Sequence, residues 1–292
     1  MEIIKDSRRN FLKRTSSGIM ALSIGSLAST SSCSSGNSPT KRRRVLDGMM
    51  HLEVYGDYWV GLVDEVIQHY DYAGIDKGVI LTTWTPSKES NDRTLAAYNK
   101  YPDRFIPFGH VRLQDSDWEN ELKRVSETPW KGLKLHQNEL RVGNSDPKEG
   151  AKIVTRKAAE LGIKLIKIHY VNYDAIEELT REIPEVTWIL PHMGCYGRWG
   201  EMRKYCELAK NRENVFLDTC AVAPYYDMGK GIEWAGADKV TFATDGYEYS
   251  VLVEKAIIET LQLPTPFRTT KLSDDEMDKI MWGNMAKLLG IN

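Results

Sequence analysis

The stretch "VLDGMMHL" (residues 45–52) is an apolar run that contains one acid and one histidine at the spacing of a β-strand. In an extended chain Asp47, Met49 and His51 point to the same face, because side chains alternate with a period of two. Histidines at both 49 and 51 would form a metal-binding pair on one strand. Methionine stands at the first position, so three interpretations remain: a metal site, a metal site that has lost one ligand, or part of the core.

Seven further apolar runs, rich in β-branched residues, follow this stretch. They alternate with longer segments whose apolar residues have helical spacing, such as "YDAIEELTREIP" (173–184). The eight runs are 45–52, 77–83, 104–111, 131–137, 164–170, 186–193, 214–221 and 239–246. Eight β–α repeats predict an α/β fold, a (β/α)8 TIM barrel that forms a single domain over 45–292. An open doubly wound sheet has the same periodicity, but no glycine-rich phosphate-binding motif follows any run.

Polar residues end six of these predicted strands. They are His51, His110, His136, His169, His192 and Asp245. The carboxyl ends of parallel barrel strands converge on the face that holds active sites, so we expect these side chains to cluster there. Of the six histidines in the chain, only His69, in a helical segment, falls elsewhere. Each histidine alone could be a structural rim residue, and Asp245 could instead cap the following helix.

The cluster has the residue types that hold a catalytic metal ion. Such an ion, typically zinc, takes three or four nitrogen and oxygen ligands and keeps one position open for water. We predict His51, His169 and Asp245 as ligands of one divalent ion. His192 is the fourth candidate, either as a ligand or as a base beside the bound water.

Two lysines, Lys134 and Lys167, share the inward parity of the histidines on their strands. A buried lysine needs a partner or a lowered pKa, and Asp47 is available for a buried ion pair beneath the site. The alternative for Lys134 is direct contact with substrate.

Further substrate-binding candidates lie at the strand ends and in the loops after them. Arg112 could bind a substrate carboxylate in a bidentate manner, or form a salt bridge with a neighbouring loop. Arg198, in "YGRWG", is an anion-binding candidate, and His136 faces the same interior. The loops after the strands are rich in aromatic residues, Trp84 among them. They predict a pocket for a planar or sugar-like small molecule. With the basic candidates, we expect a small-molecule substrate that is planar or carboxylate-bearing.

The N-terminal segment has the order of an export signal. Arg8 and Arg9 precede an uncharged stretch, and residues 1–32 resemble a twin-arginine signal peptide. The "TSSC" that ends at Cys33 resembles a lipobox, so Cys33 is the predicted lipidation site. Residues 33–44 then read as a flexible linker. We therefore expect an exported protein, either periplasmic or anchored to a membrane by lipid.

Charge and cysteine content exclude some classes of partner. The formal net charge is −2, and residues 1–32 contain five Lys/Arg and two Asp/Glu. The remaining chain is therefore mildly acidic, which gives no electrostatic reason to expect a nucleic-acid partner. Four cysteines, one of them in the leader, do not form a disulfide framework. The sequence is compatible with a homodimer but does not require one.

Several of these motifs resemble, in order, those of the amidohydrolase superfamily. They are "LDGMMHL", "KGLKLHQ", "KLIKIHY", "ILPHMG", "VFLDT", "TFATDG" and "IMWGNMAKLLGI". The resemblance is best to amidohydrolase family 2, the branch that includes aminocarboxymuconate-semialdehyde decarboxylase, and it covers the chain from Leu46 to its end. It implies that the family's strand-one histidine pair maps onto Met49 and His51, so one imidazole is missing.

The resemblance also assigns roles to the other strand ends. It implies a metal ligand at His169, a catalytic histidine at His192, and a ligand and proton carrier at Asp245. Asn284, in the closing motif, is expected to be structural. A thioether is a poor ligand for a hard divalent ion, and the family also includes lactonases that work without one.

Together these features predict an exported small-molecule hydrolase that cleaves an ester, lactone or amide, with His192 and Asp245 as catalytic residues. Non-oxidative decarboxylation is the alternative reaction, because this branch of the family does both. A barrel that has lost its ion and only binds a ligand is the alternative outside enzymes.

Overall fold

The computed structural model describes residues 42–292, except 53–58, 142, 144, 223–224, 247, 266–268 and 270. The chain divides into two compact units, Met1–Lys41 and Arg42–Asn292, of which only the second is described here. The expected signal peptide (1–32), Cys33 and most of the expected linker therefore lie outside the described residues. None of the described helices is long and apolar enough to cross a membrane.

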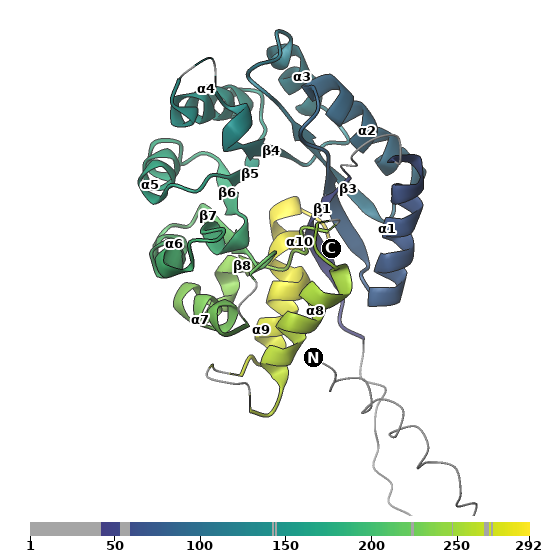
Figure 1. Ribbon diagram of the computed structural model, residues 1–292, viewed down its shortest axis with the longest axis vertical. Coiled ribbons are helices and arrows are strands. Elements are labelled where there is room, and N and C mark those ends of the chain that lie inside the picture. The colour runs from purple at the N-terminus through teal and green to yellow at the C-terminus, as the bar shows by residue number, and fades with distance from the viewer. Residues whose placement is uncertain are drawn as a thin grey trace, which may run out of the picture. The chain divides into compact units, whose positions relative to one another are not determined.

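Eight parallel strands form one sheet in the sequential order β1 to β8, as the ribbon in Figure 1 shows. The strands are β1 (Leu46–His51), β2 (Lys77–Leu81), β3 (Phe105–His110), β4 (Gly132–His136), β5 (Leu165–His169), β6 (Thr187–Leu190), β7 (Val215–Asp218) and β8 (Val240–Thr241). Each lies inside one of the predicted runs, so the predicted (β/α)8 barrel is confirmed.

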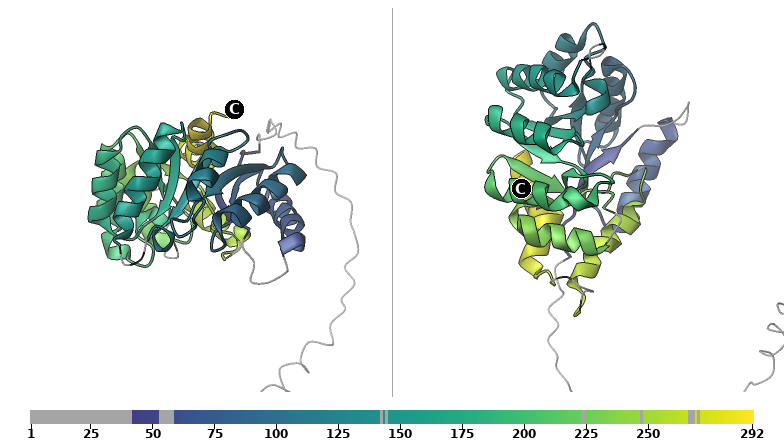
Figure 2. Two further views of the ribbon diagram at one scale, coloured as in Figure 1. Left: turned by 90° about the horizontal axis from the view of Figure 1, so that it is seen from above. Right: turned by 60° about the vertical axis from the view of Figure 1, so that its left-hand side comes forward.

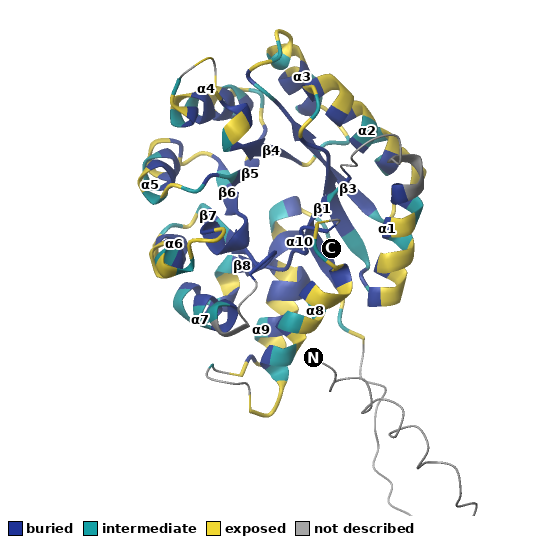
Figure 3. Cartoon of the chain, viewed as in Figure 1, coloured by how far each residue is buried: buried dark blue, intermediate teal, exposed yellow. Residues whose placement is uncertain are grey.

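Helices follow the strands and lie around the outside of the sheet (Figures 1 and 2). The eight that follow a strand are α1 (Trp59–Ala73), α2 (Ser87–Lys100), α3 (Trp118–Val125), α4 (Pro147–Glu160), α5 (Tyr173–Glu182), α6 (Met202–Asn211), α7 (Tyr225–Ala235) and α8 (Val251–Glu259). Figure 3 shows their sheet-facing sides buried and their outer sides exposed. This is the amphipathic pattern that the helical spacing of the sequence predicts.

Two short helices at the C-terminus cover one end of the barrel. They are α9 (Asp274–Asp278) and α10 (Asn284–Leu289), joined by a π-helical turn over Lys279–Gly283. Met285 and Leu289 belong to the same buried apolar cluster as Leu46 of β1. The Asn284 side chain donates hydrogen bonds of 2.7 Å to the carbonyl oxygens of Ala237 and Val240. The expected structural role of Asn284 is thereby confirmed.

The barrel closes where β1 meets the segment after β8. The Gly48 amide donates a 2.9 Å hydrogen bond to the Phe242 carbonyl, and the His51 amide donates a 2.6 Å bond to Gly246. The register of β1 shifts between Asp47 and Met50, so the strand bends at Gly48. A Cβ atom on Gly48 would lie 2.8 Å from the Phe242 carbonyl oxygen, which is too close for any other residue without movement of the backbone.

Gly48→Ala is therefore expected to lower the free energy of unfolding by about 1–3 kcal/mol, the usual cost of overpacking a tight contact. The measurement is urea unfolding of the variant beside Gly200→Ala, because a Cβ on Gly200 meets no atom within 4 Å. Equal stability of the two variants would contradict a tight seam at Gly48.

Three arginines from the end of the expected linker contact the barrel. Arg42 donates to the Gly74 carbonyl at 2.8 Å, and Arg43 donates to the Gln262 side chain at 2.8 Å. The Arg44 guanidinium carbon lies 3.5 Å from the centre of a Trp282 ring. The structure thus ties residues 42–44 of the expected linker (33–44) to the folded unit through their side chains.

Candidate active site

A cavity of about 340 Å³ opens at the carboxyl ends of the strands. It is lined by seven of the residues singled out in the sequence: His51, Trp84, Lys134, His136, His169, His192 and Asp245. They come from strands β1, β4 and β5 and from the segments that follow β2, β6 and β8. Five of the six predicted strand-end residues thus line one cavity, which is the candidate active site. His110 does not line it, and its Nε2 lies 3.2 Å from Glu139 Oε2 in the interior.

One wall of the cavity is a row of rings in edge-to-face contact. The ring centres of Trp84 and His136 lie 4.5 Å apart, those of His136 and His169 4.7 Å, and those of His169 and His192 4.8 Å. Tyr196 continues the row, with its ring centre 4.7 Å from that of His192. Such a wall presents flat apolar surfaces and ring nitrogens side by side, which suits a small planar molecule.

Burial sets the charge of the imidazoles and of the carboxylate in this cavity. It lowers the pKa of His136 to about 3 and also lowers the pKa values of His169 and His192, and the nearby Lys134 adds to each effect. Burial alone would raise the pKa of Asp245, but the hydrogen bond and charge of His51 outweigh it and the net pKa is lowered. His51 Nε2 lies 3.3 Å from Asp245 Oδ1. At neutral pH the cavity thus holds three neutral imidazoles and an ionised carboxylate.

Several residues of the cavity have a left-handed backbone. The φ angles of Trp84, His192 and Asp245 are 63°, 58° and 53°. Non-glycine residues rarely adopt this region, and such strain gathers at functional sites. Buried acids stabilise the backbone of two of these residues. The Trp84 amide donates to Glu139 Oε1 at 3.2 Å, and the His192 amide donates to Asp218 Oδ1 at 3.1 Å.

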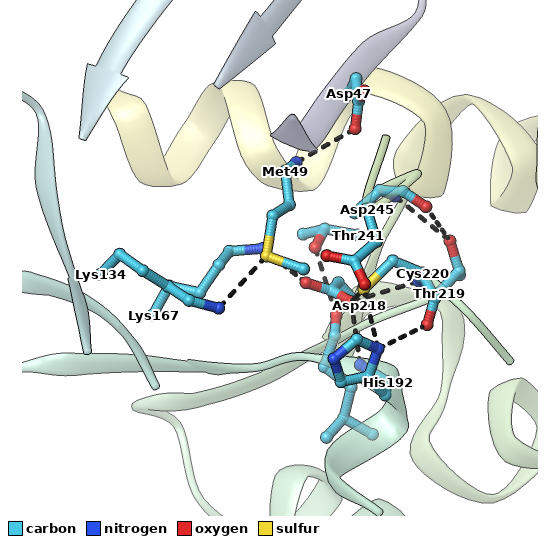
Figure 4. A network of polar contacts seen from close by, with 12 residues as sticks. Asp47, Met49, Lys134, Lys167, His192, Asp218, Thr219, Cys220, Thr241 and Asp245 are labelled. Atoms are coloured by element: carbon cyan, nitrogen blue, oxygen red, sulfur yellow. Dashed lines mark hydrogen bonds and ion pairs between the residues drawn. The ribbon is translucent and has the colours of Figure 1, made fainter. Parts of the chain in front are cut away.

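The two inward lysines have different environments, which Figure 4 shows from close by. Lys167 Nζ lies 2.5 Å from Asp218 Oδ2, and both side chains are completely buried. Lys134 is also buried, but its Nζ contacts the Met49 thioether sulfur at 3.4 Å. Among the described residues, no carboxylate forms an ion pair with Lys134. Burial lowers the pKa of Lys134 and the charge of Asp245 opposes that shift.

The expected pairing of these lysines with Asp47 is wrong. Asp47 accepts hydrogen bonds from the Met49 amide, from the amide and hydroxyl of Thr244, and from the Tyr70 hydroxyl. These four donors satisfy both carboxylate oxygens and tie β1 to the segment after β8. The lysines lie elsewhere in the barrel, where Lys167 meets Asp218 instead.

Two residues that organise the site were not among the sequence candidates. Asp218, at the end of β7, accepts hydrogen bonds from Lys167, from the His192 amide and from the Cys220 thiol at 2.8 Å. The carbonyl oxygen of Cys220 lies 3.1 Å from His192 Nδ1. Asp218 ends the observed strand β7, but the predicted run extends to 221, so Asp218 was not recognised as a residue at a strand end.

The amidohydrolase family model matches residues 61–291. The chain belongs to the amidohydrolase family. The resemblance noted in the sequence is confirmed at this level. None of the curated proteins matches the chain significantly.

Several solved structures are similar to this amidohydrolase in fold. A 2,6-dihydroxybenzoate decarboxylase bound to 2,6-dihydroxybenzoate is 18% identical, with a TM-score of 0.64, and the match covers 86% of this chain and 100% of that one. The 5-carboxyvanillate decarboxylase of Sphingomonas paucimobilis is 14% identical, with a TM-score of 0.63 and coverage of 86% and 100%. A dihydroxybenzoic acid decarboxylase of Polaromonas, with bound manganese and the inhibitor 2-nitroresorcinol, is 17% identical, with a TM-score of 0.60 and coverage of 85% and 97%. At these identities the likeness establishes the fold.

The donor groups of this amidohydrolase fit a divalent ion poorly. Within the described part of the chain, one group of three ligand-type residues has its atoms within 4.8 Å of one another, namely His192, Cys220 and Asp245. Of the predicted ligands, Asp245 belongs to this group and His51 and His169 do not. Burial raises the pKa of the Cys220 thiol well above its usual value, and the thiol donates to Asp218. Met49 offers only a thioether beside His51, which is a poor ligand for a hard divalent ion.

The two arginines proposed from the sequence as anion-binding residues do not line the cavity. Arg112 faces acids instead, with its Nε 3.9 Å from Glu139 and 4.0 Å from Asp115. Arg198 donates to the Val171 carbonyl at 3.0 Å and to Glu201 at 2.9 Å. Their expected role in substrate binding therefore lacks support from their positions, whereas Lys134, His136 and Trp84 are in place.

Glu254 of α8 is a further buried acid close to the site. It accepts a 3.1 Å hydrogen bond from the Ala221 amide, and burial raises its pKa from 4.5 to about 7. Because the folded state then holds this proton to higher pH than the unfolded chain does, stability is expected to fall as pH rises from about 4.5 to about 7.

Glu254→Gln is expected to flatten that dependence and to raise the free energy of unfolding at pH 8 by on the order of 1–3 kcal/mol. Denaturant unfolding across this pH range measures it. Glu259→Gln, at an exposed position of the same helix, is the matched control. A slope that Glu254→Gln leaves intact would show that other groups cause it.

Proposed function

We propose that this amidohydrolase releases carbon dioxide, without oxidation, from a small planar carboxylic acid bound in the cavity. The observation that supports this best is the pairing of a ring-lined wall with a buried lysine that has no acid partner among the described residues. The wall matches a flat substrate, and the lysine nitrogen can bind an oxygen of that substrate. The similar solved structures include several decarboxylases, one of them bound to a dihydroxybenzoate.

Hydrolysis, the reaction first expected from the sequence, has less support. It requires an activated water, which an ion or a base must supply. The ligand set expected for an ion fits poorly, for the reasons given above. In decarboxylation the bond to the carboxylate breaks without attack by an activated water, and several of the similar folds are decarboxylases, so this alternative has the better support.

The residues of the cavity divide the work as follows. Trp84 and His136 hold the substrate ring, and Lys134 binds an oxygen of the substrate beneath it. After carbon dioxide leaves, the carbon needs a proton. His51 and Asp245, whose Nε2 and Oδ1 lie 3.3 Å apart, form an acid–base pair that can deliver a proton there. His192 is held by Cys220 and Asp218 and closes the far end of the ring row.

The test uses the purified chain and a panel of hydroxybenzoates and unsaturated small acids, with carbon dioxide release as the readout. The methyl ester of each acid is the matched control, since it has the same ring but no free carboxylate. Release from an acid and not from its ester would support the proposal. Cleavage of lactones or esters alone would contradict the proposal and support hydrolysis instead. Binding without turnover would contradict it and favour a barrel that only binds a ligand.

Metal content tests the role of Met49. We expect the natural protein to bind zinc or manganese weakly, and Met49→His to raise that affinity about 10–100-fold, because an imidazole replaces a thioether beside His51. Titration of metal-free protein, followed by elemental analysis, measures it. Met49→Leu removes the sulfur without adding an imidazole and serves as control. Tight binding in the natural protein would contradict the poor fit.

Export by the twin-arginine route, lipidation of Cys33 and a homodimer remain predictions from the sequence. Residues 1–41 lie outside the described part of the chain.

A further inference from the structure

Lys134 is a buried lysine in the wall of the cavity. Its contacts within the described part of the chain do not explain why a lysine is buried there. Its side chain is 1% exposed, yet it lines the cavity. Its hydrogen-bond partner is the sulfur of Met49, at 3.4 Å, and a thioether is a weak acceptor. A lysine kept only for stability is normally paired with a carboxylate, as Lys167 is with Asp218.

The surroundings of Lys134 disfavour its ammonium form. Lys134 is the cross-strand neighbour of Lys167, so a second cation lies beside it in the barrel. The ionisable groups that act on it are Asp245, Lys167, Cys220 and Asp218. Burial, the largest effect, and Lys167 lower the pKa of Lys134, whereas Asp245, Cys220 and Asp218 raise it. Burial and the neighbouring cation therefore act together to favour the neutral amine, with Asp245 as the main opposing charge.

A buried lysine with a lowered pKa offers more of its neutral amine, and such an amine, open to a small-molecule cavity, is a nucleophile toward carbonyl carbon. We infer that Lys134 forms an imine with the carbonyl group of a small 3-oxo acid bound in the cavity. This inference deepens the proposed decarboxylation and rests on it, because it names the substrate class: acids with a ketone carbon one position from the carbon that bears the carboxylate.

The reaction balances without an added oxidant or reductant. The Lys134 nitrogen attacks the carbonyl carbon, and the carbonyl oxygen leaves as water with one hydrogen from the amine and one proton from solvent through the His51–Asp245 pair. A protonated imine forms, and its hydrolysis in the last step returns that proton. The bond to the carboxylate then breaks, its electron pair moves toward the imine nitrogen, and carbon dioxide departs from the resulting enamine. The enamine carbon takes one proton, which comes from solvent through the His51–Asp245 pair. Water then hydrolyses the imine and frees the amine and the ketone product.

This role also explains what Met49 does in the site. An imidazole or a carboxylate at position 49 would accept a hydrogen bond from the Lys134 ammonium and favour its protonated form. The thioether fills the same space and gives the ammonium little stabilisation. The residue that weakens a metal site thus favours an amine nucleophile.

The experiment is to incubate the full purified chain with acetoacetate and sodium borohydride at neutral pH, and to map the reduced adduct by peptide mass. We expect one adduct, on Lys134, at least about tenfold above that on Lys131, because each unit of lowered pKa gives about tenfold more neutral amine. Lys131 is an exposed lysine directly before β4, the strand that carries Lys134, and it is the matched control. Labelling spread evenly over surface lysines would overturn the inference.

Two variants sharpen the result. Lys134→Met should abolish the specific adduct. Met49→Glu should reduce labelling about tenfold or more at neutral pH, and raising the pH should restore it. Circular dichroism establishes that each variant is folded, and the wild-type peptide map stands even if one is not. Undiminished labelling in folded Lys134→Met would contradict the assignment.

Carbon dioxide is measured in parallel, so that the two proposals fail separately. An adduct on Lys134 with no carbon dioxide from any acid tested would support the amine and overturn decarboxylation. Carbon dioxide from a hydroxybenzoate, with acetoacetate leaving Lys134 unlabelled, would support decarboxylation and overturn the imine.

Discussion

Lys167→Met is expected to lower the free energy of unfolding by about 3–5 kcal/mol, the cost of leaving one charge of a buried ion pair without its partner. Lys167 Nζ and Asp218 Oδ2 lie 2.5 Å apart, and neither side chain has measurable exposure. Without the ammonium, Asp218 must either stay ionised in an apolar interior or take up a proton. The first costs desolvation energy, and the second weakens its hold on the His192 amide.

Equilibrium unfolding in urea measures this loss. Lys164→Met is the matched control, because Lys164 is an exposed lysine just before the same strand. Its effect should stay within about 0.5 kcal/mol, as is usual at surface positions. The double variant Lys167→Met/Asp218→Asn removes both charges and should recover part of the stability. A Lys167→Met variant as stable as Lys164→Met would show that the pair is not important for the fold.

The barrel could be predicted from the sequence because its signals are local. Alternation of β-branched runs with helical spacing needs only neighbouring residues, and each observed strand lies inside a predicted run. The gathering of His51, His136, His169, His192 and Asp245 followed from one further rule, that parallel strands in a barrel end on one face. The structural role of Asn284 was also predicted, because the closing motif that contains it resembles that of the family.

Side-chain pairing could not be predicted in the same way. Strand parity shows that Lys134 and Lys167 face inward, but it does not say which acid lies at the same height in the barrel. Asp47 contacts Thr244 and Tyr70, and the register of β1 shifts between Asp47 and Met50. Neither feature is apparent in the residue pattern.

The conformations of the loops after the strands also could not be predicted from the sequence. Whether Arg112 and Arg198 face the cavity depends on the conformations of their loops, which the spacing of residues in the sequence does not determine. In the structure Arg112 faces a nearby acid and Arg198 donates to a backbone carbonyl. The reaction type was ambiguous for a related reason. The same histidines and aspartate are compatible with hydrolysis and with the proposed decarboxylation. The proposal depends on the environment of Lys134, which only three-dimensional contacts reveal.

Asp245→Asn should have the largest effect on catalysis, a fall in kcat/KM of about 10²–10⁴-fold, the usual contribution of a positioned acid or base. The change keeps the size of the side chain and removes its charge. His51 then loses the anion 3.3 Å from its Nε2, so the pair that supplies the proton is broken. Because the pKa of Asp245 is lowered, the natural carboxylate stays ionised in mildly acidic buffer, and its titration should not limit the rate there.

The rate of carbon dioxide release from the best acid of the panel is the measurement, with unfolding curves to show that the fold is kept. Asp238→Asn is the matched control. Asp238 is an exposed aspartate just before β8, the strand that Asp245 follows, and it pairs with Lys279 on the surface. We expect that variant to keep the natural rate. Full activity in a folded Asp245→Asn would place the proton donor elsewhere, with His192 the next residue of the cavity to replace, because a decarboxylated carbon cannot be released as product without a proton.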